Sequence, residues 1–250
     1  MKKIYVSDLI CLNDSIEETR NFFEKNNIKR VEFFIENQDI EHSKKLEFIL
    51  KSLKTESISF HASYRYFRLT CSDEKWDLME NDFKKSIEIC KEHNGEFLVL
   101  HTNEGLPGEV MDKGILEKRI QKLIKLGKEK EVKVVIENVG IGKNILYNQE
   151  EYIELIKKYN FDSLIDIGHA IANNWDLDKV ITELKENIIA YHFHNNDGEK
   201  DLHKSIYDGK ADYERIISLV KENTPEANIV LEYSAATPKR EILEILEKLS

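Results

Sequence analysis

Residues 188–198 read IIAYHFHNNDG, an apolar and aromatic run that ends at two histidines and a turn rich in Asn, Asp and Gly. The run is typical of a strand buried on both faces, as in a parallel sheet. His192 and His194 are two residues apart, so they point to the same side of the strand as Ala190, which we expect to be the interior. His194 lies further along the strand and is the candidate ligand; His192, one layer deeper, is expected to support it or to pack.

Seven more runs of this kind occur, and helical patterns separate them. Alternation of short β-branched runs with longer amphipathic segments predicts βα units and a parallel sheet. The eight runs span residues 3–7, 29–36, 57–61, 96–101, 132–137, 163–167, 188–194 and 228–233; helix candidates include 15–26, 82–93, 115–130, 149–159, 178–186 and 213–223. Eight runs in 250 residues predict one α/β domain over residues 1–250, a single (β/α)8 TIM barrel.

The composition narrows the class of protein. With 41% hydrophobic and 34% charged residues, the chain is expected to fold around a core, and no run is long enough for a membrane span. The first residues enter a strand pattern without a cleavable signal, so we expect a cytoplasmic protein without a membrane partner. A net charge of −10 disfavours a broad nucleic-acid surface, and three cysteines without C-x-x-C spacing disfavour a thiolate zinc site.

Polar residues gather where the predicted strands end, which is where barrel active sites are built. The six are His61, His101, Glu137, Asp166, His194 and Glu232. Three carboxylates in one confined mouth repel one another unless a cation or protons compensate them. We therefore predict a divalent metal held by Glu137, Asp166, His194 and Glu232, an oxygen-rich set that suits Mn²⁺, Mg²⁺ or Co²⁺; further histidines would shift the preference toward Zn²⁺.

These residues resemble the xylose-isomerase-like barrel superfamily, which includes sugar-phosphate isomerases and epimerases and the endonuclease IV family. The similar segments are SFHASY, VLHTN, VIENVG, LIDIGHA, HFHNNDGEKDLHKSIYDGKAD and VLEYS, across the last four-fifths of the chain. The resemblance implies that Glu137, Asp166, His194 and Glu232 hold the shared metal. It also places His61, His101, His169, Asp201 and His203 where endonuclease IV-like members complete a three-zinc cluster, although in sugar-isomerase-like members such residues line the substrate pocket.

Two functions follow from the resemblance. The first is isomerisation or epimerisation of a small sugar or sugar phosphate, with Glu137 and Glu232 as catalytic proton-transfer groups beside the metal. The alternative is zinc-dependent phosphodiester cleavage at abasic sites, which alone would require a nucleic-acid partner. Where a ketose 3-epimerase would carry an Arg after the seventh-strand histidine, this chain has N-N-D-G-E-K. The segment 64–68, YRYFR, fits a lid over a sugar or a DNA-inserting loop, and the oligomeric state stays open.

Overall fold

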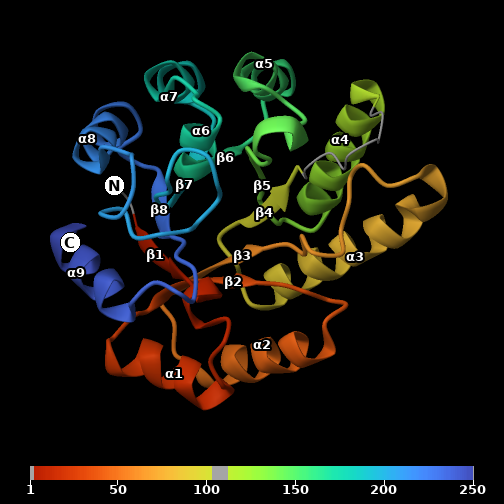
Figure 1. Cartoon of the computed structure of the whole chain (residues 1–250). Coiled ribbons are helices and arrows are strands. Elements are labelled where there is room, and N and C mark those ends of the chain that lie inside the picture. Colours follow the sequence, from red (N-terminus) through yellow and green to blue (C-terminus); the bar gives the residue numbers. More distant parts are fainter. Residues whose placement is uncertain (1–2, 103–111, 250) are drawn as a thin grey trace.

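Eight parallel strands close into a barrel in the computed structural model, which describes residues 3–102 and 112–249 (Figure 1). The strands pair in sequence order, and β8 returns to pair with β1. They are β1 (Ile4–Ser7), β2 (Arg30–Phe34), β3 (Ser57–His61), β4 (Leu98–His101), β5 (Val134–Glu137), β6 (Ser163–Asp166), β7 (Ile188–Phe193) and β8 (Asn228–Leu231). The predicted (β/α)8 barrel is therefore confirmed, and each strand lies within its predicted run.

Helices surround the barrel as an outer ring (Figure 1). They are α1 (Ile16–Lys25), α2 (Ile40–Ser52), α3 (Asp73–Glu92), α4 (Lys113–Glu129), α5 (Gln149–Tyr159), α6 (Ile167–Ala172), α7 (Leu177–Leu184), α8 (Tyr213–Asn223) and α9 (Lys239–Leu249), with short 3₁₀ turns at Asp8–Cys11 and Gly142–Asn144. No helix among the described residues is long and apolar enough to cross a membrane.

Two apolar layers hold the barrel together. Tyr5, Phe97, Val135, Leu164 and Ala190 belong to a small cluster of buried residues from strands on different sides of the barrel. A much larger cluster joins the strands to the helix ring. Both faces of each strand are thus covered, which explains why the strand runs are almost continuously apolar.

Polar groups cover the amino-terminal end of the barrel. Glu96, just before β4, accepts hydrogen bonds from Tyr5 (2.6 Å), Ser57 (2.9 Å) and Asn228 (3.1 Å), and Lys3 forms an ion pair with it. These side chains come from four strands or their flanks, so the carboxylate ties the strands together where few apolar side chains remain. This network lies at the end of the barrel opposite the predicted site.

The transition from β6 to α6 has no connecting loop. Asp166 is the last residue of β6 and also the N-cap of α6, where its Oδ1 accepts a 2.6 Å hydrogen bond from the His169 backbone N–H. A side-chain acceptor at this position satisfies one of the free N–H groups of the first helical turn. The same carboxylate therefore begins a helix and faces the carboxyl end of the barrel.

Candidate metal centre

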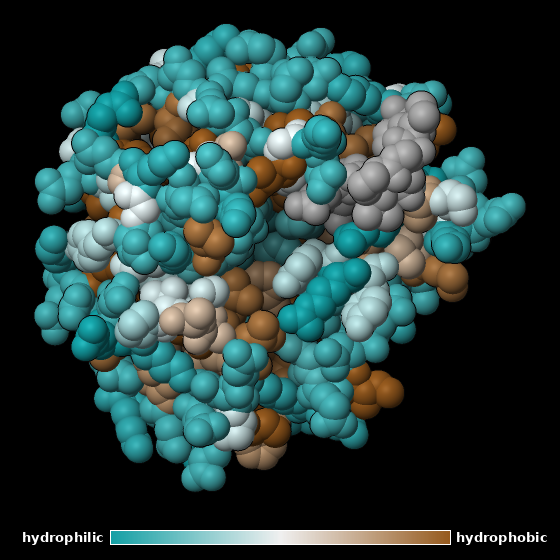
Figure 2. Space-filling view, in the orientation of Figure 1, coloured by the Kyte–Doolittle hydropathy of each residue, from teal (hydrophilic) through white to brown (hydrophobic). Residues whose placement is uncertain are grey.

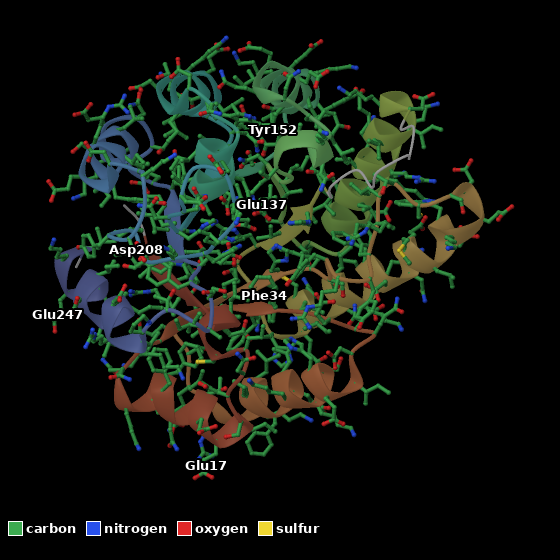
Figure 3. The ribbon with its side chains drawn as sticks, viewed as in Figure 1. Glu17, Phe34, Glu137, Tyr152, Asp208 and Glu247 are labelled. Carbon is green, nitrogen blue, oxygen red and sulfur yellow. The ribbon has the colours of Figure 1, made fainter. Side chains whose placement is uncertain are left out.

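The six polar residues predicted to end strands do so in the structure. His61, His101, Glu137 and Asp166 are the last residues of their strands, and His194 and Glu232 follow β7 and β8 directly. In Figure 3, Glu137 lies near the centre of the molecule, whereas Glu17, Asp208 and Glu247 lie at its periphery. The carboxyl ends of the strands thus gather these side chains at one mouth.

The mouth is hollow. A pocket of about 580 Å³ opens there, and the surface view shows a depression near the centre of the same face (Figure 2). Its lining includes His61, His101, Glu137, His169, Asp201, His203 and Glu232, together with Tyr64, Arg65 and Arg68 from the loop after β3. Asp166 and His194 are fully buried, consistent with a position below the exposed lining.

The buried carboxylates are close to one another and to histidine nitrogens. Ligand atoms of Asp166, His194 and Glu232 lie within 4.8 Å of one another, and Glu137 forms a second such group with Asp166 and His192. Asp166 Oδ2 is 2.9 Å from His194 Nε2, and Glu137 Oε1 is 3.2 Å from His192 Nδ1. The four predicted ligands thus fall into two overlapping groups that share Asp166.

The backbone of Gly168 makes room for the His194 ring. A Cβ atom at position 168 would lie only 1.9 Å from His194 Cε1, which no side-chain packing tolerates. Tyr213 donates a 2.6 Å hydrogen bond to the His194 carbonyl and fixes the strand end from the other side. Among the described residues, nothing forms a hydrogen bond with His194 Nδ1.

A further group of possible ligands includes His194. It contains His169, His194, Asp201 and His203, all with ligand atoms within 4.8 Å of one another. Asp201 Oδ2 is 3.0 Å from His203 Nε2 and 3.3 Å from His169 Nε2, and the His203 ring stacks on His194 at 4.0 Å. His203 has φ +46°, a left-handed conformation that costs a non-glycine residue about 1–2 kcal/mol.

Another group of the same kind consists of His61, His101 and Glu137. His61 Nε2 lies 3.2 Å from Glu137 Oε2, and its ring stacks on Phe34 at 4.5 Å. All nine residues predicted to bind metal or substrate therefore belong to groups of this geometry. The structure thus brings all nine side chains into neighbouring groups at the mouth of the barrel.

Opposite charges govern the pKa values of the site. Burial disfavours ionisation of Glu137 and Asp166, but the facing histidines outweigh burial and hold both pKa values well below normal. At Glu232, by contrast, burial outweighs the neighbouring histidines and raises the pKa, and the charges of Glu137 and Asp166 add to the effect. The pKa values of these neighbouring carboxyl groups are thus shifted in opposite directions.

Glu32 and His192 are also part of the cluster, although the sequence predicted only a supporting or packing role for His192 and Glu32 was not among the predicted site residues. Both side chains are fully buried, and His192 Nε2 lies 2.9 Å from Glu32 Oε1. A signal was present: a glutamate within an otherwise apolar strand run needs a buried partner. The spacing of His192 and His194 indicated the side that they share but not the partner across the barrel.

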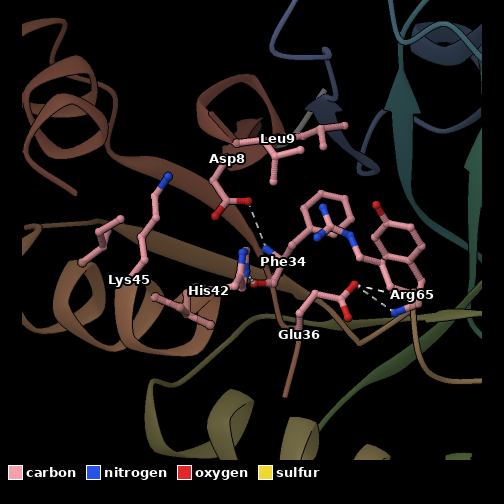
Figure 4. Close-up of a pocket in the computed structure, with 11 residues that line it drawn as sticks. Asp8, Leu9, Phe34, Glu36, His42, Lys45 and Arg65 are labelled. Carbon is pink, nitrogen blue, oxygen red and sulfur yellow. Dashed lines mark hydrogen bonds between the residues drawn. The ribbon is translucent and has the colours of Figure 1, made fainter. Parts of the chain in front are cut away.

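The rim loop is fixed to the end of β2. Glu36 Oε1 accepts hydrogen bonds from the backbone N–H groups of Tyr64 (3.4 Å) and Arg65 (3.3 Å), beside a small cavity that Asp8 and His42 also line (Figure 4). Arg65 makes a long contact, 3.9 Å, with Asp39, and its guanidinium lies 5.9 Å from the centre of the Tyr64 ring. The loop that carries the aromatic and basic rim residues is therefore held by a buried carboxylate.

The donor set fits a divalent cation. Glu137, Asp166 and Glu232 are each at most 3% exposed, so their mutual repulsion is not screened by water. Carboxylate oxygens with imidazole nitrogens suit Mn²⁺, Mg²⁺ or Co²⁺, and the additional histidines suit Zn²⁺. His194 Nδ1 and Glu232 Oε2, which have no hydrogen-bond partner among the described residues, leave coordination capacity in the centre.

Comparisons with known proteins agree with this architecture. An uncharacterized protein of Methanocaldococcus jannaschii is 22% identical over 237 residues, which cover 88% of this chain and 80% of the relative. A D-tagatose 3-epimerase-like protein superposes with a TM-score of 0.80 at 19% identity, covering 98% of this chain and 96% of that one.

Two further solved structures are similar. An AP endonuclease of family 2 from Brucella melitensis has a TM-score of 0.77 at 13% identity and covers 99% of both chains. The IOLI protein with a bound zinc atom has a TM-score of 0.77 at 17% identity and covers 98% of this chain and 95% of that one. At these identities the structural likeness establishes the fold. A family model described as xylose isomerase-like TIM barrel matches residues 22–249, and the chain belongs to this family.

Proposed function

We propose that this protein is a divalent-metal-dependent isomerase or epimerase that acts on a small sugar or sugar phosphate by proton transfer next to a carbonyl. The supporting observation is the set of three buried carboxylates with facing imidazoles at the floor of a pocket of about 580 Å³. We further propose that residues 1–250 act as one domain. The solved structures with similar folds include an epimerase-like protein, which agrees with this activity.

Glu137, Asp166, His194 and Glu232 would hold the metal, as the sequence predicts. A divalent cation at such a site polarises neighbouring carbonyl and hydroxyl oxygens and thereby acidifies the adjacent C–H bond. It would also neutralise the carboxylates, whose burial is otherwise costly. His169 and His61 line the same pocket and are placed to bind substrate hydroxyl groups.

Glu137 and Glu232 would move the proton. They lie at the ends of β5 and β8, three strands apart around the barrel, and both line the pocket. One of these carboxyl groups would accept the proton from the carbon next to the carbonyl, and the other would deliver a proton to carbon.

The pocket favours a small polar substrate. Its volume falls within the roughly 300–1,000 Å³ of typical small-molecule sites, whereas a DNA-processing site requires a longer groove. Tyr64, Arg65 and Arg68 line its rim and could contact hydroxyl or phosphate groups of a bound sugar. The net charge of −10 also disfavours phosphate tracking along a duplex.

Hydrogen exchange tests the proposed chemistry without knowledge of the product. Metal-loaded protein is incubated in D₂O with a panel of ketoses, aldoses and their phosphates, and each sugar is analysed by mass spectrometry. We expect one substrate class to gain deuterium at carbon, and Glu137→Gln protein to show no gain. If no sugar exchanges hydrogen under any of the four metals, the proposed activity is wrong.

One observation favours the alternative, an endonuclease IV-like phosphodiesterase. All nine positions that would hold three zinc ions lie in the groups described above, including His61, His101 and the Asp201–His203 pair. Cleavage of duplex DNA that carries one abasic site, compared with intact duplex, tests it directly. Specific cleavage by zinc-loaded protein, with three metals per chain, would replace the sugar assignment.

A further inference from the structure

A hydrogen-bonded pair, Glu32 and His192, lies beneath the predicted metal ligands. Glu32 comes from β2 and His192 from β7, and neither side chain is exposed to solvent. The Ser59 hydroxyl donates to Glu32 Oε2 at 3.1 Å, and His192 Nε2 lies 2.9 Å from Glu32 Oε1. Three strands therefore contribute to one polar contact in the interior of the barrel.

The pair fixes the orientation of the imidazole ring. A carboxylate can only accept, so His192 Nε2 is the donor to Glu32. Nδ1 then faces the predicted ligands and lies 3.2 Å from Glu137 Oε1, 3.2 Å from Glu232 Oε2 and 3.7 Å from Asp166 Oδ2. A single ring atom thus touches all three carboxylates of the centre.

We infer that Glu32 and His192 form a positioning pair that holds the carboxylates of Glu137 and Glu232 at the separation required for metal binding. The inference rests on the metal site of the proposed function. His192 is in direct contact with the ligands, and Glu32 acts through His192. Outer partners of this kind commonly orient metal ligands, and their loss weakens metal binding.

A contribution to folding stability does not by itself explain why Glu32 and His192 occupy these interior positions. Burying a carboxylate and an imidazole is costly, and well-packed apolar residues of similar volume often stabilise a protein as well or better. The neighbouring interior positions are apolar, as Val135, Leu164 and Ala190 show. Glu32 and His192 depart from this apolar pattern directly beneath the predicted ligands, which fits a role in arranging the metal site.

The test compares matched Glu→Gln variants at opposite ends of the barrel. Glu32→Gln keeps the shape of the side chain but removes its charge, and Glu96→Gln does the same in the amino-terminal network. For each protein, Co²⁺ affinity is measured by competition with a chelator, and the visible spectrum of bound Co²⁺ reports the ligand geometry. Ser59→Ala, which removes only the hydroxyl donor to Glu32, serves as a milder second variant.

We expect Glu32→Gln to lower Co²⁺ affinity by about 10- to 100-fold and to change the Co²⁺ spectrum. Ser59→Ala should weaken binding in the same direction by a smaller factor, and Glu96→Gln should alter stability while affinity stays within two-fold of wild type. Equal affinity in wild type and Glu32→Gln, or an equal loss in Glu96→Gln, would overturn the inference. Should Glu32→Gln fail to fold, an unchanged affinity and spectrum in Ser59→Ala would overturn it.

The results distinguish a failure of the proposed function from a failure of the positioning role. If wild-type protein does not bind Co²⁺ or any of the other metals, the proposed function itself fails. If the wild type binds Co²⁺ and the Glu32 and Ser59 variants bind it equally well, only the positioning role is wrong.

Discussion

Replacing Gly168 with Ala should displace the side chain of His194, a proposed metal ligand. The new Cβ would meet His194 Cε1 at 1.9 Å and Nδ1 at 2.4 Å, whereas ordinary contact begins at 3.4 Å. The ring must therefore retreat by about 1.5 Å, the difference between 3.4 and 1.9 Å. A shift of this size breaks the 2.9 Å contact between His194 Nε2 and Asp166 Oδ2.

The expected change in the stability of Gly168→Ala protein follows from two opposing effects. Alanine favours a helix over glycine by about 1 kcal/mol, whereas overpacking costs about 1–3 kcal/mol, so the metal-free protein should lose about 0–2 kcal/mol. Metal affinity should fall more clearly, by at least about ten-fold or 1.4 kcal/mol, because one ligand is displaced. Urea unfolding in the presence of a chelator measures the first quantity, and chelator competition measures the second.

Gly127→Ala provides a matched control within α4. There the added Cβ would lie 2.4 Å from Val134 Cγ2, so the substitution also overpacks a helix against the barrel but away from the mouth. The Gly127→Ala protein should be less stable than wild type but should bind metal with unchanged affinity. If Gly168→Ala protein binds metal within two-fold of wild type, His194 is not a ligand and the reasoning is refuted.

Three further outcomes are expected. Glu137→Gln protein should fold but lose turnover by at least about 10²- to 10⁴-fold, the usual contribution of acid–base catalysis, and full activity would exclude Glu137 from proton transfer. Saturation with metal at 100 times its Kd should stabilise the protein by about 2.7 kcal/mol and raise Tm by about 5–11 °C over chelated protein, and an unchanged Tm would contradict a metal centre. At Glu96, burial opposes ionisation, but Lys3 and its neighbours outweigh burial and lower the pKa to about 2 from 4.5. The stability that the Glu96 carboxylate contributes is therefore complete above pH 4.5 and is lost as the pH falls toward 2. In urea titrations, the difference in unfolding free energy between wild type and Glu96→Gln should shrink over that interval. A constant difference would contradict the assigned network.

The architecture could be predicted from sequence because each strand carries its own signal. The run SISFH predicted β3 to the residue, and QEEYIELIKKY predicted α5 likewise. Short elements were less visible: residues 167–172 form α6, although the sequence LIDIGHA gives only one helical turn and no amphipathic period. Its N-cap, Asp166, was predicted as a strand end and metal ligand but not as the start of a helix.

Residue types at strand ends revealed the candidate site, since polar side chains are unexpected in buried runs. The partners of those side chains were harder to predict because they depend on contacts across the barrel. Glu32 and His192 are 160 residues apart in sequence and 2.9 Å apart in the structure. Spacing within a strand determines a side chain's face, but the pairing of opposite strands depends on barrel closure.

Because Asp166 ends β6 and begins α6, no flexible loop adjoins this proposed ligand. The position of any ion bound by Asp166 would therefore be fixed by β6 and α6. Loops elsewhere on the mouth, such as the one that carries Tyr64 and Arg65, could be exchanged for loops of other lengths without displacing that anchor. A designer who wished to retool this protein for a new substrate would therefore rebuild the rim and leave the β6–α6 junction untouched.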